Sequence, residues 1–245
     1  MILLTIVQNI MSSMSLEEVN SIEEVPESIQ IAEIVRETYN EILAHREWDF
    51  LKETFSLEAS GSSAKPVLMA IPSNVSDVKL IKYLDENDSK YKDVAYVSPE
   101  EFIELTNSRV RQGTKYTGLV KQVEVGLYIF TNKQPEYFTT FDGKNIIFDS
   151  FNSEHDTTLQ ASKTLCHGTR LPTVQIDDDY EIDMPEEMIW SYLLPECKSV
   201  ASINILQTAN AKEEQRSRRG RFRMYHSHPK TTETIERVRT QFGRK

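Results

Sequence analysis

The residues best placed for metal chemistry form one short acidic segment. Three aspartates at 177–179 are followed by Glu181 and Asp183, which is the alternating spacing with which a calcium-binding loop begins. Such a loop also needs a glycine at its sharp turn and a glutamate at its last position, and this chain has Ile182 and Met188 there. We therefore expect a solvated acidic loop rather than a calcium site.

Cysteine and histidine, the ligands typical of zinc, are too scattered to form a site. His167 follows Cys166, and His226 and His228 flank one serine, but neither pair has two further ligands at a spacing that zinc sites use. The other cysteine, Cys197, lies 31 residues after the first, so the sequence indicates no disulfide framework either. We expect no metal and no cofactor.

No motif for covalent or phosphate chemistry is present in the sequence. The eight glycines are isolated, which excludes the glycine-rich loops that hold phosphate groups. The chain also has neither a Gly-x-Ser-x-Gly nucleophile elbow nor a His-Glu-x-x-His pair. We expect no catalytic residue and a protein that is not an enzyme, with an enzyme of unknown type in the β-rich part as a minor alternative.

The strongest chemical signal is a segregation of charge. Residues 211–245 contain eleven basic and four acidic residues, a net charge of +7, whereas the whole chain has −10 and the remainder therefore −17. Three interpretations of this arm stay open: a solvated helix end, a surface that docks on protein, and a nucleic-acid arm that tracks phosphates and stacks on bases. The acidic body argues against the last, because it repels DNA and RNA.

Within this arm the order of residues favours protein docking. Between 219 and 224 arginines alternate with glycine, phenylalanine and methionine, which predicts an extended strand with one basic and one apolar face. Pro229 then interrupts the chain, and threonine at 231 or 232 can begin a last helix that is too short to be stable alone. The residues expected to contact a protein partner are Arg216, Arg218, Arg219, Arg221, Phe222, Arg223, Met224, Tyr225, Ile235, Val238 and Phe242.

Two amphipathic helices are predicted near the start of the chain. Apolar residues recur at helical spacing from Leu3 to Met14 and again, after Pro26, from Ile31 to Leu43. The first segment lacks the basic start and the cleavage pattern of a signal peptide, so we expect it to pack rather than to direct export. No stretch approaches the roughly 20 apolar residues of a membrane span, and no membrane partner is expected.

The middle of the chain has the residue pattern of β structure. Asp142-Gly143 predicts a two-residue hairpin turn between β-rich flanks. One helix over 100–106 interrupts the strands, because Ser98 with Glu101 three residues later forms a capping box. The clearest strands are expected within residues 78–83, 94–97, 126–130 and 139–148.

A second helical region follows. From Glu186 an apolar pattern at helical spacing continues through Trp190 and Cys197 beyond Ala211. Pro195 lies inside this pattern and is expected either to kink the helix or to mark the start of a second one. Because all these helices have an apolar stripe that needs cover, we expect one helical layer made from both chain ends. The fold class predicted is α+β, with a mainly antiparallel β module inserted into that layer and an extended C-terminal arm. The expected domains are residues 1–47 with 183–215 (helical), 48–182 (β-rich) and 216–245 (basic docking arm).

Three segments of the chain carry a family resemblance. Residues 19–22 read Val-Asn-Ser-Ile, and residues 48–50 read Trp-Asp-Phe after Glu47. They resemble the start of tail tubular protein A-type adaptors of short-tailed bacteriophages, where a Val-Asn-Ser-Leu-like segment precedes a helix ending in Gly-Trp-x-Phe. Residues 184–219 are similar to the closing helix of that family, which follows an acidic-Pro pair and ends rich in Ala, Lys, Glu, Gln and Arg.

This resemblance implies a structural, non-enzymatic protein of the virion. It implies a homo-oligomeric ring of twelve copies between the portal protein and the tail nozzle (tail tubular protein), around a channel through which double-stranded DNA passes without specific binding. The chain is then a head–tail adaptor, present in the host cytoplasm during assembly, whose basic arm grips the portal or a neighbouring subunit. The alternative is a nucleic-acid-binding regulatory protein that uses the arm on phosphates.

Overall fold

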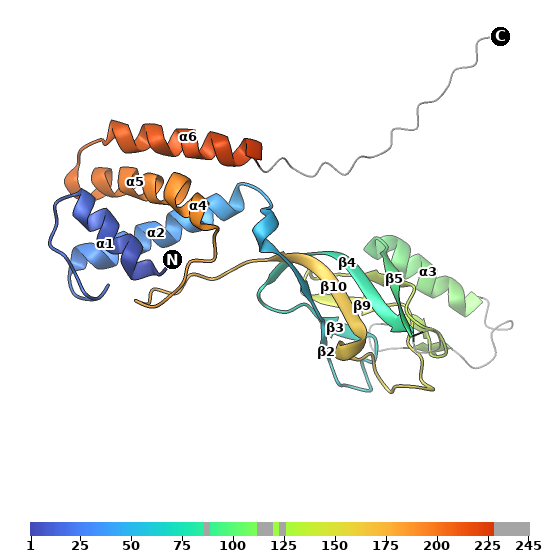
Figure 1. Ribbon diagram of the computed structural model, residues 1–245. Helices are drawn as coiled ribbons and strands as arrows, with labels where there is room; N and C mark the ends of the chain where they lie inside the picture. The colour runs from blue at the N-terminus through green and yellow to red at the C-terminus, as the bar shows by residue number, and fades with distance from the viewer. Residues whose placement is uncertain (86–88, 112–119, 123–125, 228–245) are drawn as a thin grey trace, which may run out of the picture. The chain divides into compact units, whose positions relative to one another are not determined.

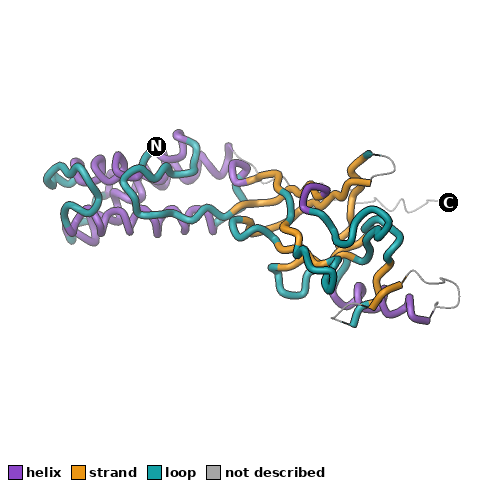
Figure 2. The backbone as a smooth tube through the Cα atoms, turned by 90° about the horizontal axis from the view of Figure 1, so that it is seen from below, coloured by secondary structure: helices purple, strands orange, loops and turns teal. Residues whose placement is uncertain are grey.

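The computed structural model describes residues 1–85, 89–111, 120–122 and 126–227. The chain forms two compact units, one from Met1–Phe50 with Val174–Lys245 and the other from Leu51–Thr173. Helices dominate the first unit and a mixed sheet dominates the second, so the fold class is α+β (Figures 1 and 2). The chain thus crosses between units after Phe50 and after Thr173, where the sequence places these crossings at 47 and 182.

The helical unit begins with two helices that match the predicted ones. Helix α1 spans Leu3–Ser13 and α2 spans Pro26–Ala44, and each buries the stripe that its 3.6-residue period defines. The chain start is tied to the later half of the unit, since the Leu3 amide donates to the Tyr180 carbonyl at 2.8 Å. The aspartate-rich loop at 177–183 therefore has a structural role beyond solvation, because Asp178 Oδ1 accepts a hydrogen bond of 2.7 Å from the Ile22 amide.

In the closing part of this unit a new α-helix begins next to Pro195, which is one of the two alternatives that the sequence leaves open, whereas the chain reversal at Gln207 is not predicted. After one turn of α-helix, α4 (Glu186–Met188), the chain forms the π-helix η3 (Ile189–Leu193) and then α5 (Leu194–Leu206). Pro195 lies in the first turn of α5, where its missing N–H costs little. Helix α5 ends at Gln207, whose left-handed φ of 52° reverses the chain, so that α6 (Ala211–Ser227) packs back on η3 and α5.

The β unit is built on an eight-stranded sheet in the order β1-β10-β4-β5-β8-β9-β3-β2. All its pairings are antiparallel except that of β5 with β8, and β6 and β7 form a separate antiparallel pair. Short 3₁₀ turns, η1 (Asp49–Leu51) and η2 (Ala161–Lys163), precede β1 and β10. The strands are β1 Lys52–Phe55, β2 Glu58–Ala59, β3 Leu68–Ala70, β4 Val75–Asp85, β5 Lys90–Tyr96, β6 Val120–Gln122, β7 Tyr128–Phe130, β8 Tyr137–Thr139, β9 Asn145–Phe148 and β10 Thr164–Arg170.

The hairpin predicted at Asp142-Gly143 exists, with a longer connection than two residues. Strand β8 ends at Thr139 and β9 begins at Asn145. Asp142 Oδ1 accepts hydrogen bonds from the amides of Lys144 at 2.9 Å and Asn145 at 2.7 Å. The Asn145 side chain adds a further bond, and together these bonds lower the pKa of Asp142. Gly143 takes the positive φ of 69° that the turn requires.

Helix α3 (Pro99–Arg111) is capped as predicted and extends further than predicted. The Glu101 amide donates to Ser98 Oγ at 3.3 Å, and Ser98 Oγ donates back to the Glu101 carboxylate at 3.1 Å. The helix continues beyond Thr106 and buries Phe102 in the core of the β unit. Near the C-terminal end of this helix, the Arg109 side chain is also buried.

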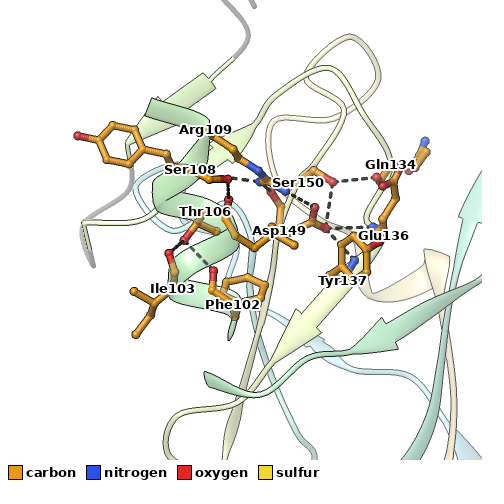
Figure 3. A network of polar contacts seen from close by, with 12 residues as sticks. Phe102, Ile103, Thr106, Ser108, Arg109, Gln134, Glu136, Tyr137, Asp149 and Ser150 are labelled. Carbon is orange, nitrogen blue, oxygen red and sulfur yellow. Dashed lines mark hydrogen bonds and ion pairs between the residues drawn. The ribbon is translucent and has the colours of Figure 1, made fainter. Parts of the chain in front are cut away.

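A buried ion pair fastens α3 to the sheet (Figure 3). Arg109 Nη2 lies 2.7 Å from Asp149 Oδ2, and the two side chains are only 8% and 3% exposed. The other Asp149 oxygen accepts hydrogen bonds from the amides of Glu136 at 3.0 Å and Tyr137 at 2.9 Å. Arg109 also donates 2.7 Å to the Asp149 carbonyl and stacks on the Phe130 ring at 4.1 Å. Both charges are therefore compensated inside the protein.

Removing one partner of this pair is expected to destabilise the β unit strongly. Asp149→Asn keeps the shape of the side chain but leaves the Arg109 guanidinium as an uncompensated buried charge, so we expect the free energy of unfolding to fall by about 3–5 kcal/mol. Urea denaturation followed by circular dichroism measures it. The matched control is Asp93→Asn, whose carboxylate is 71% exposed and 3.0 Å from Lys82, where we expect less than about 1 kcal/mol. Equal losses in both variants would contradict this role of the buried pair.

Candidate docking surface

The basic segment at 216–224 is helical, so the extended strand predicted for it is wrong. Helix α6 is capped by Asn210, the residue before it, whose side-chain oxygen accepts a hydrogen bond from the Glu213 amide at 3.3 Å. Arg216 pairs with Glu213 and Arg218 with Glu214 at helical spacing. The alternation of arginine with other residues also fits a helix, because the residues that α6 buries recur every three or four positions: Glu213, Ser217, Gly220 and Met224.

Gly220 lets α6 approach the backbone of η3 closely. A Cβ added at this position would lie 1.8 Å from the carbonyl oxygen of Ser191 and 3.3 Å from the Cα of Tyr192. One turn earlier, the buried Ser217 hydroxyl hydrogen-bonds to the Glu196 carboxylate. The glycine is therefore required by the packing of α6 and not by a turn.

The end of α6 is held by aromatic rings. The Tyr225 ring contacts the Trp48 ring edge-on with centroids 6.1 Å apart, and the Arg46 guanidinium lies 4.9 Å from the Trp48 ring and 5.7 Å from the Tyr225 ring. Trp48 is itself buried, and its indole N–H donates to the Ile42 carbonyl at 2.9 Å. Phe50 also stacks near Trp48, at 6.0 Å. The side chains of the Trp-x-Phe segment thus position the basic helix.

The structure divides the predicted contact residues into three groups. The five arginines are exposed and Phe222 is 68% exposed, so these side chains are accessible on α6. Met224 is buried and Tyr225 is half-buried, which makes Met224 a core residue rather than the docking residue predicted. The remaining predicted residues, Ile235, Val238 and Phe242, lie outside the described residues.

A hollow of about 350 Å³ lies between η3 and α6, at the edge of the exposed arginines. Trp190 forms part of its wall and is 42% exposed, with its indole N–H donating to Glu186 Oε1 at 3.2 Å. The sequence places Trp190 on the buried stripe of its helix, so its surface role was missed, and no pattern in the sequence indicates it. The residues lining the hollow are Glu187, Trp190, Ser191, Arg216, Arg219, Gly220 and Arg223.

The electrostatics of this surface favour binding of an anionic group. Burial raises the pKa of Tyr192 to about 12, so its phenol stays neutral beside the arginines at physiological pH. The pKa of Arg221 is raised, chiefly by the negative charge that Tyr192 acquires only at high pH, so its guanidinium stays charged throughout the physiological range. Burial also raises the pKa of Cys197 to about 12, so this thiol stays protonated. Guanidinium groups around an exposed indole suit the recognition of carboxylates or phosphates.

Two further expectations from the sequence are that the chain holds no metal ion and does not span a membrane. Over the described ranges, no three histidine, cysteine or acidic side chains come together in a way that would hold a metal ion. Among the helices that the structure describes, none has the length and apolar character needed to cross a membrane.

No protein-family model matches the sequence. No curated protein matches it either.

Replacing Gly220 with alanine is expected to weaken the packing of α6. Alanine favours an isolated helix by about 1 kcal/mol, but here its methyl group overlaps the Ser191 carbonyl oxygen. Overpacking of this kind costs about 1–3 kcal/mol, so we expect a net loss of stability in urea denaturation followed by the fluorescence of Trp48 and Trp190. Phe222→Ala on the exposed side of the same helix is the control and is expected to leave stability nearly unchanged. A more stable Gly220→Ala variant would contradict the close contact.

Proposed function

We propose that this chain is a structural virion protein, a head–tail adaptor that forms a ring between the portal protein and the tail nozzle around the DNA channel. In this proposal the chain is located at the head–tail interface of the virion, and double-stranded DNA passes through the ring without specific binding. It rests on the resemblance of the two chain ends to phage adaptors, and the fold supplies three observations in its support.

The observation that carries the proposal most is that the resembling segments share one core. Val19 and Ile22, from the Val-Asn-Ser-Ile segment, are buried in the helical unit, as is Trp48. Helices α1 and α2, which flank this segment, pack on α5 within the closing segment 184–219. Just outside that segment, the Ile22 amide bonds to Asp178 and the Trp48 ring contacts Tyr225. Segments separated by more than a hundred residues thus pack together in one helical unit. This is expected if the residues that carry the family resemblance are packing residues.

Charge gives a second line of support. The chain carries −17 outside residues 211–245, and a negatively charged wall repels phosphate. The lack of attraction suits a conduit, because a duplex that must slide should not bind. The third line is the exposure of the arginines and Phe222 on α6, which offers a basic surface to an acidic partner in a neighbouring ring. Repetition of such a contact around a ring raises its total strength by avidity.

Removal of residues 228–245 tests the role of the arm. A chain ending at Ser227 keeps the described contacts of α6, so we expect an unchanged melting temperature together with loss of co-assembly with portal rings of the same virus, seen by electron microscopy. A chain with a Gly/Ser segment of equal length in place of 228–245 is the matched control and should also fail. If the unaltered chain does not join the portal ring, the proposed function is wrong. If the shortened chain joins it normally, the role of the arm is wrong.

A salt titration separates the adaptor from a nucleic-acid-binding regulator. For the adaptor we expect negligible binding of a short double-stranded DNA at about 0.15 M salt, measured by fluorescence anisotropy. A regulator would show measurable affinity that falls steeply as salt rises, because phosphate contacts release counterions. Arg218→Glu and Arg219→Glu should then both weaken that affinity. Such a result would favour the regulator.

A further inference from the structure

The helical unit carries opposite charges on two of its parts. Residues 1–35 contain six glutamates and neither lysine nor arginine. Helix α6, by contrast, has six basic and two acidic residues, a net charge of +4. In Figure 1, α6 lies on one side of α5, and α1 and α2 lie on the other, in agreement with the contacts between these elements. The acidic and basic surfaces of one molecule therefore face away from each other over most of their length.

The loop between α1 and α2 concentrates the negative charge. We define the acidic segment as residues 15–27, which contain Glu17, Glu18, Glu23, Glu24 and Glu27, all exposed. Glu24 accepts a hydrogen bond of 2.6 Å from the Asn20 amide within the loop. Across the part of the chain that the structure describes, no basic side chain lies within ion-pair distance of Glu17, Glu18 or Glu23. Three carboxylates therefore lack a counter-charge in the described molecule.

The hollow between η3 and α6, called the Trp190 hollow from here on, has a basic and apolar lining that complements the acidic segment. Arg219 lines it, and no described carboxylate lies within ion-pair distance of this guanidinium. The half-exposed indole of Trp190 adds an apolar wall, and the acidic segment offers the partly exposed Leu16 and Val25 to cover it. Asn20 and Ser21 in the same segment supply donors for Glu187, which also lines the hollow. A phosphate backbone carries no such donors and would be repelled by Glu187.

Charge disfavours a symmetric contact of α6 with itself. In a two-fold dimer built on α6 the same basic surface would face itself, and like charges at short range oppose association. A contact between two different surfaces on opposite sides of one unit is heterologous, and heterologous contacts generate rings when their rotation closes. The charge distribution therefore matches head-to-tail association of identical chains.

We propose that the Trp190 hollow, with the arginines that line it (Arg216, Arg219 and Arg223), binds the acidic segment of a second copy of this chain. This inference rests on the proposed ring and names the two surfaces that meet in it. The contact places Arg219 against Glu17, Glu18 or Glu23 of the neighbour, with Trp190 covered by the apolar residues of that segment.

Charge reversal on each surface tests the contact. Arg219→Glu is expected to raise the dissociation constant for self-association at least about tenfold, equivalent to about 1.4 kcal/mol. Arg218→Glu is the matched control, because Arg218 lies on the same helix, does not line the hollow and is 77% exposed. A variant with E17K, E18K and E23K should lose self-association as well. Arg219→Gln replaces Arg219→Glu if the latter melts at a lower temperature than the unaltered chain.

Mixing the two kinds of variant gives the sharpest outcome. Arg219→Glu keeps an intact acidic segment and the triple variant keeps an intact hollow, so in a mixture each contact pairs opposite charges and the two chains should associate alternately, seen by native mass spectrometry. Combining all four substitutions in one chain should restore self-association. If Arg219→Glu and Arg218→Glu assemble alike, or the mixture stays monomeric, the inference is overturned. Normal rings of the unaltered chain would then leave the proposed function standing, whereas failure to join a portal ring removes that function separately.

Discussion

The approach of α6 to the backbone of η3 is the constraint on which the basic surface depends. At Gly220 the helix lies so close to Ser191 that there is no room for a side chain. This contact fixes the rotation of α6 about its axis, because only one side of the helix fits against η3. Ser217 and Met224 then turn inward, and the arginines between them turn toward solvent. The arginines are thereby presented from fixed backbone positions, so less backbone entropy is lost on binding than from an unfolded arm.

The β unit is organised by a different kind of interaction. The Arg109–Asp149 pair joins a helix to the start of the segment after β9, and each of its charged groups meets several partners. A buried ion pair is weak evidence for stability in itself, since apolar residues of similar volume often do as well. Its geometry is nevertheless demanding, because both Asp149 oxygens and the guanidinium must be satisfied together. We interpret it as a device that selects one position of α3 against the sheet.

Local patterns in the sequence predicted local structure well. The amphipathic periods of α1 and α2 and the Ser98–Glu101 capping box involve residues within a few positions of each other, so the sequence contains the whole interaction. The parallel pairing of β5 with β8 and the Arg109–Asp149 pair join residues about 40 positions apart, and no short pattern encodes them. In α6 two periods competed, and the i, i+4 ion pairs with the buried stripe outweighed the alternation of arginines. The sequence pattern placed Trp190 on the buried side of its helix because it grouped this residue with Cys197, whereas the buried residues next to it are Met188, Ile189, Tyr192 and Leu193.

The exposure of Trp190 has a wider consequence. The stripe that this turn buries consists of Met188, Ile189, Tyr192 and Leu193, at spacings of three and four residues. Trp190 lies outside that stripe, half-exposed, with its indole N–H bonded to Glu186 one turn earlier. The turn thus presents one large apolar ring to solvent while its buried side is complete without it. Substitution at position 190 can therefore alter the surface of the helical unit without altering its core.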